Sequence, residues 1–155
     1  MEQRLNFPTK HVCRITGLSK RQVVYWDRTH FIKPSVSEAA GYGSTRLYSL
    51  RDLVQLAVAK KLKDRGISLR KMRKILSFLS KWLFLPPSPA EVRRLRLVSD
   101  GESLFRLTDN PTAVLDEREA YDLVFVVALG EIIAEVQNEI EQLTADRIYN
   151  VQVGQ

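Results

Sequence analysis

The chain has 155 residues, of which 45% are hydrophobic and 27% charged, so it can form one or two small domains with a buried core. Its apolar runs stay well below the roughly 20 residues of a membrane helix, so no membrane-spanning segment is expected. One cysteine, Cys13, cannot form an internal disulfide, which fits a reducing cytoplasm. The net charge of +6 divides into +13 for residues 1–81 and −7 for residues 82–155. This division predicts a basic half that meets a polyanion, although RNA, an acidic membrane face or a merely solvated surface would also suit the charge.

Two short helices joined by a turn are predicted for residues 9–28. Gly17 can adopt the positive φ that a tight turn between helices requires, and Ser19 can cap a second helix that runs from residue 20 to about residue 28. We expect Trp26 on the buried side of that helix. The outer side is the candidate reader of the DNA major groove, and it carries Lys20, Arg21, Val24 and Arg28.

A basic hairpin is predicted directly after these helices. Residues 31–36 and 45–48 have the composition of two strands, and the Gly-rich residues 39–44 form the tip between them. Arg46 is the arginine of this hairpin. A helix-turn-helix followed by a basic wing is a shape that holds duplex DNA, so double-stranded DNA is the expected partner.

Two further helices are predicted after the wing. A capping box of Ser49 and Asp52 begins the first helix, Gly66 ends it, and Ser68 caps the second helix, residues 69–82. Apolar residues at helical spacing predict a buried stripe of Leu69, Met72, Ile75, Leu76 and Leu79. The opposite face is basic and either contacts the DNA backbone or keeps the helix soluble; it includes Arg70, Lys71 and Lys74.

The second half of the chain is predicted to form its own domain. Prolines at positions 86, 87 and 89 cannot continue a helix, and the sign of the charge changes there, so we divide the chain into residues 1–84 and 85–155. A short helix is expected to follow, up to about Leu95. The pair Asp100–Gly101 is a strong hairpin signal and predicts a two- or three-stranded antiparallel sheet.

A long helix is predicted for about residues 117–143, with a loose tail from Asn150. The β-branched residues of segment 124–127 weaken this prediction locally. The helix has an apolar seam that packs either on the chain's own hairpin or on a second chain, formed by Leu129, Ile132, Val136, Ile140 and Leu143. The predicted fold is mainly α with small β, in which a winged helix-turn-helix precedes a small antiparallel sheet and a long helix.

The sequence contains no pattern that is typical of a catalytic or metal site. His11 and His30 have no acid or cysteine at ligand spacing, and Cys13 is expected to be buried and unreactive. There is no nucleophile elbow, phosphate-binding glycine loop or pair of carboxylates with a positioned base. We therefore expect neither an enzyme nor a bound metal or cofactor.

Several motifs occur together in the order and at the spacing of one known family. They are Gly17–Ser19 with Tyr25–Pro34, then Gly43–Leu53, then Arg65–Leu76. Over about residues 7–79 the chain resembles the winged-helix domain of the MerR family of bacterial transcription regulators. The resemblance implies a dimeric, cytoplasmic, promoter-binding protein, with RNA polymerase or a toxin as a further protein partner.

The resemblance also implies roles for individual residues. Tyr25 falls where the family has an aromatic near the phosphate backbone, and Arg46 where the wing arginine grips phosphate, with Tyr48 packed under it. Val24 departs from the family, which usually has an arginine at that position. The candidate DNA-binding residues are Lys20, Arg21, Tyr25, Arg28, Gly43, Ser44, Arg46, Arg70 and Lys71.

The predicted function is sequence-specific transcriptional regulation by a homodimer on a palindromic promoter operator. No cysteine follows Cys13, so the metal-sensing cysteines of some family members are missing. Residues 98–127 are also faintly similar to the sheet-plus-helix tail of MerR-like antitoxins. A protein that binds a toxin through its acidic half and regulates its own promoter therefore remains an alternative, as does an architectural DNA binder with little sequence preference.

Overall fold

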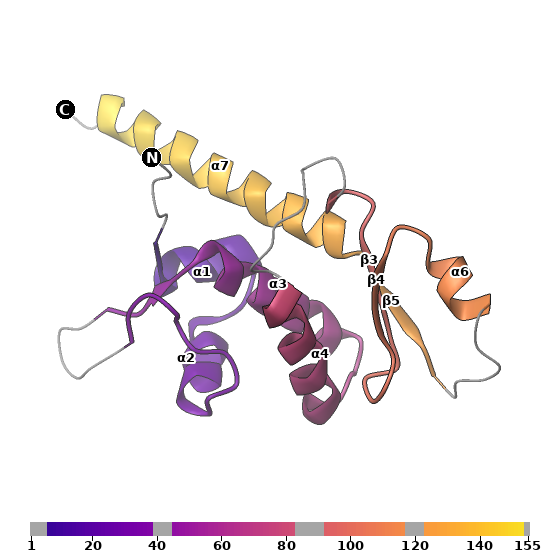
Figure 1. Ribbon diagram of the computed structural model, residues 1–155. Helices are drawn as coiled ribbons and strands as arrows, with labels where there is room; N and C mark the ends of the chain where they lie inside the picture. The colour runs from indigo at the N-terminus through magenta and orange to yellow at the C-terminus, as the bar shows by residue number, and fades with distance from the viewer. Residues whose placement is uncertain (1–5, 39–44, 83–91, 117–122, 154–155) are drawn as a thin grey trace. The chain divides into compact units, whose positions relative to one another are not determined.

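The computed structural model describes residues 6–38, 45–82, 92–116 and 123–153 (Figure 1). The chain divides into two compact units, one formed by residues 1–53 with 134–155 and the other by residues 54–133. Two helices contribute residues to both units: α3 spans Leu50–Asp64 and α7 spans Leu129–Val153. Among the described residues, no helix is both long enough and apolar enough to span a membrane.

The first unit begins with the predicted pair of helices. Helix α1 spans Thr9–Thr16 and α2 spans Lys20–Arg28. Gly17 ends α1 with a φ of 75°, and the Ser19 hydroxyl accepts the backbone N–H of Gln22 at 3.1 Å. Both features are those that the sequence predicted, because a left-handed glycine and a serine cap depend only on neighbouring residues.

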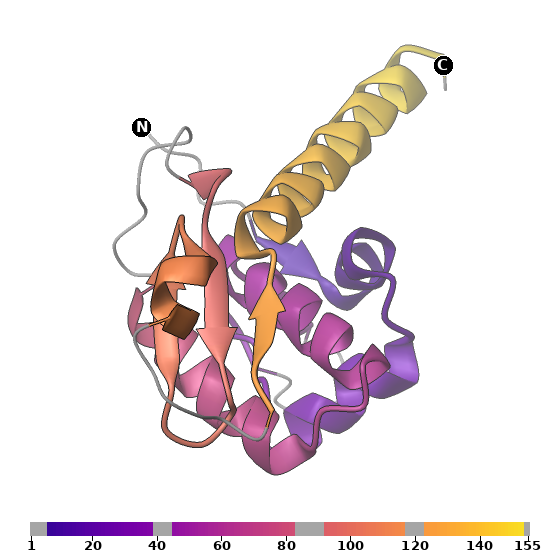
Figure 2. The same ribbon diagram turned by 90° about the vertical axis from the view of Figure 1, so that its right-hand side faces the viewer.

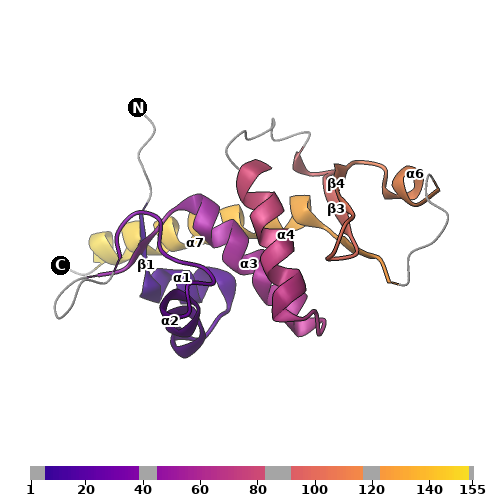
Figure 3. The same ribbon diagram turned by 60° about the horizontal axis from the view of Figure 1, so that its bottom comes forward.

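Helix α1 lies between α2 and the C-terminal part of α7, as two views of the unit show (Figures 1 and 3). Arg14 of α1 forms an ion pair with Asp146 of α7. Apolar side chains of the two short helices and of the turn between them are buried, namely Val12, Ile15, Leu18, Val23 and Trp26. The confirmed burial of Trp26 places the basic side of α2 away from this core.

The strands at the wing differ from the predicted hairpin. Strand β2, Leu47–Tyr48, pairs antiparallel with β1, Phe7–Pro8. The segment after α2 meets β2 at an isolated bridge between Ser37 and Leu47, where the N–H groups of Val36 and Ser37 both donate to the Leu47 carbonyl at 3.2 Å. The predicted strand 31–36 is therefore wrong. Before Val36 its N–H groups bond elsewhere, since Phe31 donates to the Trp26 carbonyl and Ser35 to the Asp52 carboxylate, and Pro34 has no N–H. The predicted tip, residues 39–44, lies outside the described residues.

Helices α3 and α4 have the predicted caps. The Ser49 hydroxyl accepts the Asp52 N–H at 3.1 Å, and the Asp52 carboxylate accepts the Ser49 N–H at 2.9 Å. Gly66 has a φ of 78°, and helix α4 spans Leu69–Trp82. The buried stripe of α4 lacks Leu69, which is 49% exposed because it occupies the first position of the helix. The other four predicted members of the stripe are buried.

The second unit contains a three-stranded antiparallel sheet with the order β4-β3-β5 (Figure 2). Strand β3 spans Arg96–Ser99, β4 spans Phe105–Thr108 and β5 spans Phe125–Val127. The sheet lies between α4 and the short helix α6, Pro111–Asp116 (Figures 1 and 3). On the α4 side, the rings of Phe78 and Phe105 stack with their centroids 5.6 Å apart.

The third strand corrects the predicted limits of the last helix. Strand β5 and helix α7 both lie where the sequence predicted one helix over 117–143, because the β-branched segment before Ala128 favours a strand. At its other end α7 continues to residue 153, so the tail predicted to be loose from Asn150 is helical through Val153. The Pro-rich boundary at 85–89 and most of the helix expected before Leu95 lie outside the described residues, and the division into domains at 84/85 stays a prediction.

The apolar seam of α7 is largely covered within the single chain. Leu129, Ile132, Val136 and Leu143 are buried, whereas Ile140 is half-buried. This burial is what packing on the chain's own elements would produce. Pairing with a second chain through the same residues stays a prediction.

Candidate nucleic-acid interface

The outer face of α2 gathers the residues that the sequence predicted for the major groove. Arg21, Tyr25 and Arg28 follow one another at steps of four and three, so they lie on one face of the helix. All three are exposed, Tyr25 to 61%, and Lys20 at the start of the helix is exposed as well. The helix therefore presents cations and a phenol, groups that bind phosphates and guanine edges.

Val24 lies on this same face, between Arg21 and Arg28, and is half-buried. An isopropyl group cannot donate a hydrogen bond to phosphate or to a base. It can make apolar contact with a thymine methyl group in the major groove. Val24 could therefore contact a base by a different chemistry from the arginine that is usual at this position in the MerR family.

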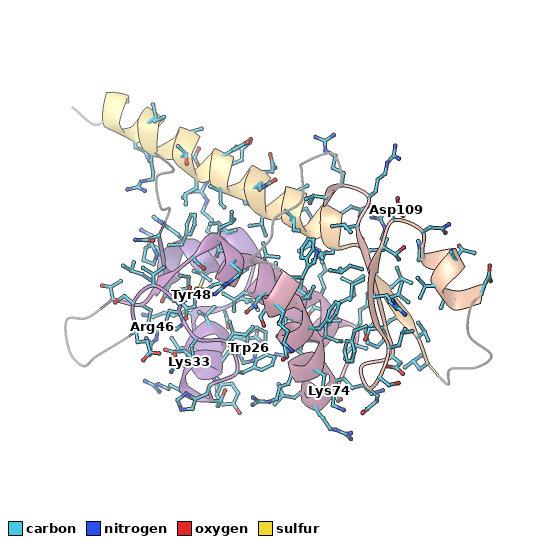
Figure 4. All side chains as sticks on the ribbon, viewed as in Figure 1. Trp26, Lys33, Arg46, Tyr48, Lys74 and Asp109 are labelled. Atoms are coloured by element: carbon cyan, nitrogen blue, oxygen red, sulfur yellow. The ribbon has the colours of Figure 1, made fainter. Side chains whose placement is uncertain are left out.

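Behind this face, the carboxylate of Asp27 is buried and receives two cations. Its Oδ2 accepts from Arg46 Nε at 2.5 Å, and its Oδ1 accepts from Lys33 Nζ at 3.4 Å. Figure 4 shows Lys33 and Arg46 close to each other on the side of the unit where Tyr48 and Trp26 lie. Since Asp27 belongs to α2 and Arg46 directly precedes β2, the ion pair joins the candidate recognition helix to the base of the wing.

Tyr48 is completely buried beside this cluster, at 0% exposure. Within the described part of the chain, its hydroxyl has no hydrogen-bond partner. Burial, and after it the negative charge of Asp27, raises the pKa of the Tyr48 phenol far above its usual range. Tyr48 is therefore a neutral core residue at the base of the wing.

Arg46 has an intramolecular partner that the sequence did not predict. Its side chain is 20% exposed, and its Nε is directed to Asp27. The sequence contains no signal for this contact, since an acid 19 positions before an arginine shows no periodicity. Gly43 and Ser44, the predicted backbone donors of the wing, lie outside the described residues.

The basic face of α4 belongs to the second unit and also has an unpredicted partner. Arg70 Nη2 and Lys74 Nζ donate to the same oxygen, Oε2 of Glu102, at 3.0 and 2.8 Å. Arg70 remains 73% exposed, and Lys71 is half-buried. The sequence contains no signal for this contact, because Glu102 lies about thirty residues further along the chain.

Helix α1 carries His11 and Cys13, two residue types that can bind metal ions. Partial burial, followed by nearby Arg147 and Lys10, lowers the pKa of His11, so this imidazole is neutral at pH 7. Burial likewise raises the pKa of the Cys13 thiol, which is half-buried. In the part of the chain that the structure describes, no group of three or more His, Cys, Asp or Glu residues could hold a metal ion.

Helices α1 and α2 are joined by a tight turn, and α2 exposes a basic face. An ion pair connects α2 to Arg46, directly before strand β2. This arrangement defines a helix-turn-helix nucleic-acid-binding domain. Residues 7–79 match the family described as MerR HTH family regulatory protein. These residues therefore form a domain similar to the helix-turn-helix domain of the MerR regulators.

Two curated relatives extend the likeness into the second half. They are the uncharacterized HTH-type transcriptional regulators Rv1830 of Mycobacterium tuberculosis (strain ATCC 25618 / H37Rv) and Mb1861 of Mycobacterium bovis (strain ATCC BAA-935 / AF2122/97). Each is 33% identical over 135 residues, which is 87% of this chain. The chain spans 57% of the length of these relatives, so the likeness includes more than the helix-turn-helix but not the whole of either relative.

Proposed function

We propose that the chain is a cytoplasmic, sequence-specific transcriptional regulator that binds a palindromic promoter operator as a homodimer. The observation that carries this proposal is the exposed face of α2, on which Arg21, Tyr25 and Arg28 lie together. Phosphate contacts from such a face set affinity and register, whereas the arginine fork can also read a guanine. The names of the relatives support regulation of transcription for this chain as well.

Each residue of this face has a distinct proposed role. Arg21 and Arg28 contact guanine edges or phosphates, and the Tyr25 hydroxyl donates to a phosphate. Val24, between them, packs on a thymine methyl group and so favours an A·T pair at one position of each half-site. Arg46 and the backbone of Gly43 and Ser44 hold phosphates through the wing.

The homodimer and the palindrome are linked by symmetry. A two-fold dimer places two copies of α2 on equivalent half-sites, so its operator is an inverted repeat. The dimer interface is proposed on α7, where the exposed Ile148 lies beyond the buried part of the seam. Sedimentation equilibrium tests this: the expected mass is that of two chains, and a monomer at all concentrations would refute the dimer.

Fluorescence anisotropy with labelled duplex DNA tests the role of α2. Arg21→Ala should weaken binding to the operator and relax base preference at one position of each half-site, with a discrimination loss of about 1–3 kcal/mol. Arg147→Ala removes the same charge from α7, which lies on the opposite side of α1 from α2 (Figure 1). It is the matched control, provided that sedimentation shows the same oligomeric state as for the wild type, because Arg147 is next to Ile148. Equal effects of the two substitutions would mean that α2 does not read bases.

A salt titration separates this proposal from architectural binding. Non-specific binding depends almost wholly on phosphate contacts and counterion release. A regulator keeps a preference for its operator over random duplex throughout the titration. If affinity for operator and random DNA is the same at every salt concentration, the chain is an architectural binder and the proposal of sequence-specific regulation is wrong.

A further inference from the structure

The loop between β3 and β4 places an acidic side chain on the basic face of α4. One oxygen of Glu102 accepts hydrogen bonds from both Arg70 and Lys74, at 3.0 and 2.8 Å. These two residues are four positions apart and hence on one side of the helix. All three residues belong to the second unit.

The loop holds Glu102 in this position by its own local structure. The Oδ1 atom of Asp100 accepts the backbone N–H groups of Glu102, Ser103 and Leu104 at 2.8 to 2.9 Å. Gly101 has a φ of 75°, which lets the chain reverse just before Glu102. The loop therefore fixes the backbone of Glu102 beside α4, while its 39% exposed side chain is held by the two ion pairs.

The loop also lies directly against α4. A Cβ added at Gly101 would lie 2.8 Å from Cβ and Cγ of Lys71, so the glycine packs on the stem of that lysine. At the end of the loop, Phe105 stacks on Phe78, two turns further along the helix. The hairpin thus lies along the side of α4 that carries Lys71 and leaves Arg70 and Lys74 partly exposed beside it.

This contact has a consequence for a polyanion. A phosphate that approaches Arg70 or Lys74 has to displace the Glu102 carboxylate or bind beside its negative charge. Ion pairs as exposed as these contribute little to folding stability, so fold stability does not explain the arrangement. The Glu102 carboxylate can nevertheless compete with phosphate for the nitrogen atoms of Arg70 and Lys74, even though these groups are exposed.

We propose that Glu102 competes with the DNA backbone for Arg70 and Lys74. By accepting hydrogen bonds from these two side chains, Glu102 occupies the groups that would bind phosphate and so lowers the affinity of α4 for duplex DNA. This inference rests on the proposed function, because it requires that the chain binds DNA. Under this proposal the acidic half of the chain, residues 82–155, weakens DNA binding by the basic half, residues 1–81, through the side chain of Glu102.

Anisotropy titrations of the full chain on a labelled random-sequence duplex test the competition. Glu102→Gln keeps the size of the side chain and removes its charge, and it should bind DNA more tightly than the wild type. If one further cation then contacts phosphate, the gain in affinity should be about 3-fold larger at about 50 mM than at about 200 mM salt.

Asp109→Asn is the matched control. It removes one negative charge from the same unit but at the opposite end of β4, far from Lys74 (Figure 4). The competition predicts a clearly smaller effect for Asp109→Asn than for Glu102→Gln. Equal gains for the two variants would show a general effect of net charge and overturn the inference.

A second background distinguishes direct competition from other effects of Glu102. In the chain with Arg70→Ala and Lys74→Ala, Glu102→Gln should no longer change affinity, because the masked cations are gone. A gain that persists there overturns the inference while the proposed function stands. Absence of duplex binding by the wild type and by Glu102→Gln, with folding verified by circular dichroism, would instead refute the proposed function and this inference with it.

Discussion

Asp27 near the end of α2 and Arg46 just before β2 form an ion pair across 19 residues of chain. Asp27 is buried, and Lys33 adds a second cation to it at 3.4 Å. The pair connects the helix proposed to read bases with the strand at the base of the wing. The position of Arg46 relative to α2 therefore depends on a buried carboxylate.

Asp27→Asn should destabilise the chain and weaken DNA binding together. The variant leaves Arg46 and Lys33 without their counter-charge, and we expect a loss of about 1–3 kcal/mol, less than for a fully buried pair because both cations reach water. Urea unfolding measures the loss. Asp64→Asn removes an exposed acid paired with Lys60 and should leave the unfolding midpoint unchanged. Equal stability of Asp27→Asn and the wild type would contradict a structural role for the pair.

Arg46→Ala should weaken binding to operator and random duplex by a similar factor, as expected for a lost phosphate contact. Its salt dependence should become shallower by about one counterion. Arg46→Lys keeps the charge but not the planar fork and should recover only part of the affinity. Unchanged affinity of Arg46→Ala at low salt would show that the wing arginine serves Asp27 alone.

Gly130→Ala should destabilise the second unit strongly. A Cβ at this position would lie 2.0 Å from the carbonyl oxygen of Val92, and the Gly130 N–H donates to Leu95 at 3.1 Å. The clash is with backbone, so we expect a loss of about 3 kcal/mol or more. Gly66→Ala is the comparison, because a Cβ there meets no atom within 4 Å and adds only left-handed strain of about 1 kcal/mol. Thermal unfolding that ranks Gly66→Ala as the more damaging change would contradict the packing of α7 on residues 92–95.

Stability should fall as the pH is lowered from about 4 to about 2, in part through Asp100. Partial burial acts to raise the pKa of Asp100, but three backbone N–H donors and the Ser103 hydroxyl bring it down to about 2. Because the folded pKa lies below the unfolded one, the unfolded chain takes up the proton first, so this stabilisation is complete above about pH 4 and is lost toward pH 2.

The contribution of Asp100 should be about 1–2 kcal/mol once solvent screening is allowed for. Asp100→Asn keeps an oxygen acceptor for the loop but removes the charge. Urea midpoints of the two proteins, measured across this pH range, should converge as the pH falls. Parallel curves for wild type and Asp100→Asn would contradict the role given to the carboxylate.

Local rules were sufficient for the parts of the fold in which neighbouring residues determine the conformation. The caps at Ser19, Ser49 and Ser68, and the left-handed glycines at 17 and 66, depend on residues at most four positions away. The exposed face of α2 followed from the same helical period. These features locate the helix-turn-helix without any knowledge of tertiary structure.

Contacts between distant residues were not predictable in this way. Strand β1 has only two residues, which is too short for alternation to be seen, and their partners lie 41 and 39 positions away. The β-branched residues of segment 124–127 weakened the helix prediction, but no local pattern specifies that β5 pairs with β3. Glu102 and Asp27, the two acids that control basic residues of the candidate interface, were missed for the same reason.

Selection of bound sequences from random duplex DNA, at near-physiological salt, tests the central claim most directly. We predict enrichment of an inverted repeat whose spacing reports the distance between the two copies of α2, with an A·T pair opposite Val24 in each half-site. Recovery of bound DNA without any enriched sequence would contradict sequence-specific regulation, and Val24 would be the first residue to substitute in order to learn why.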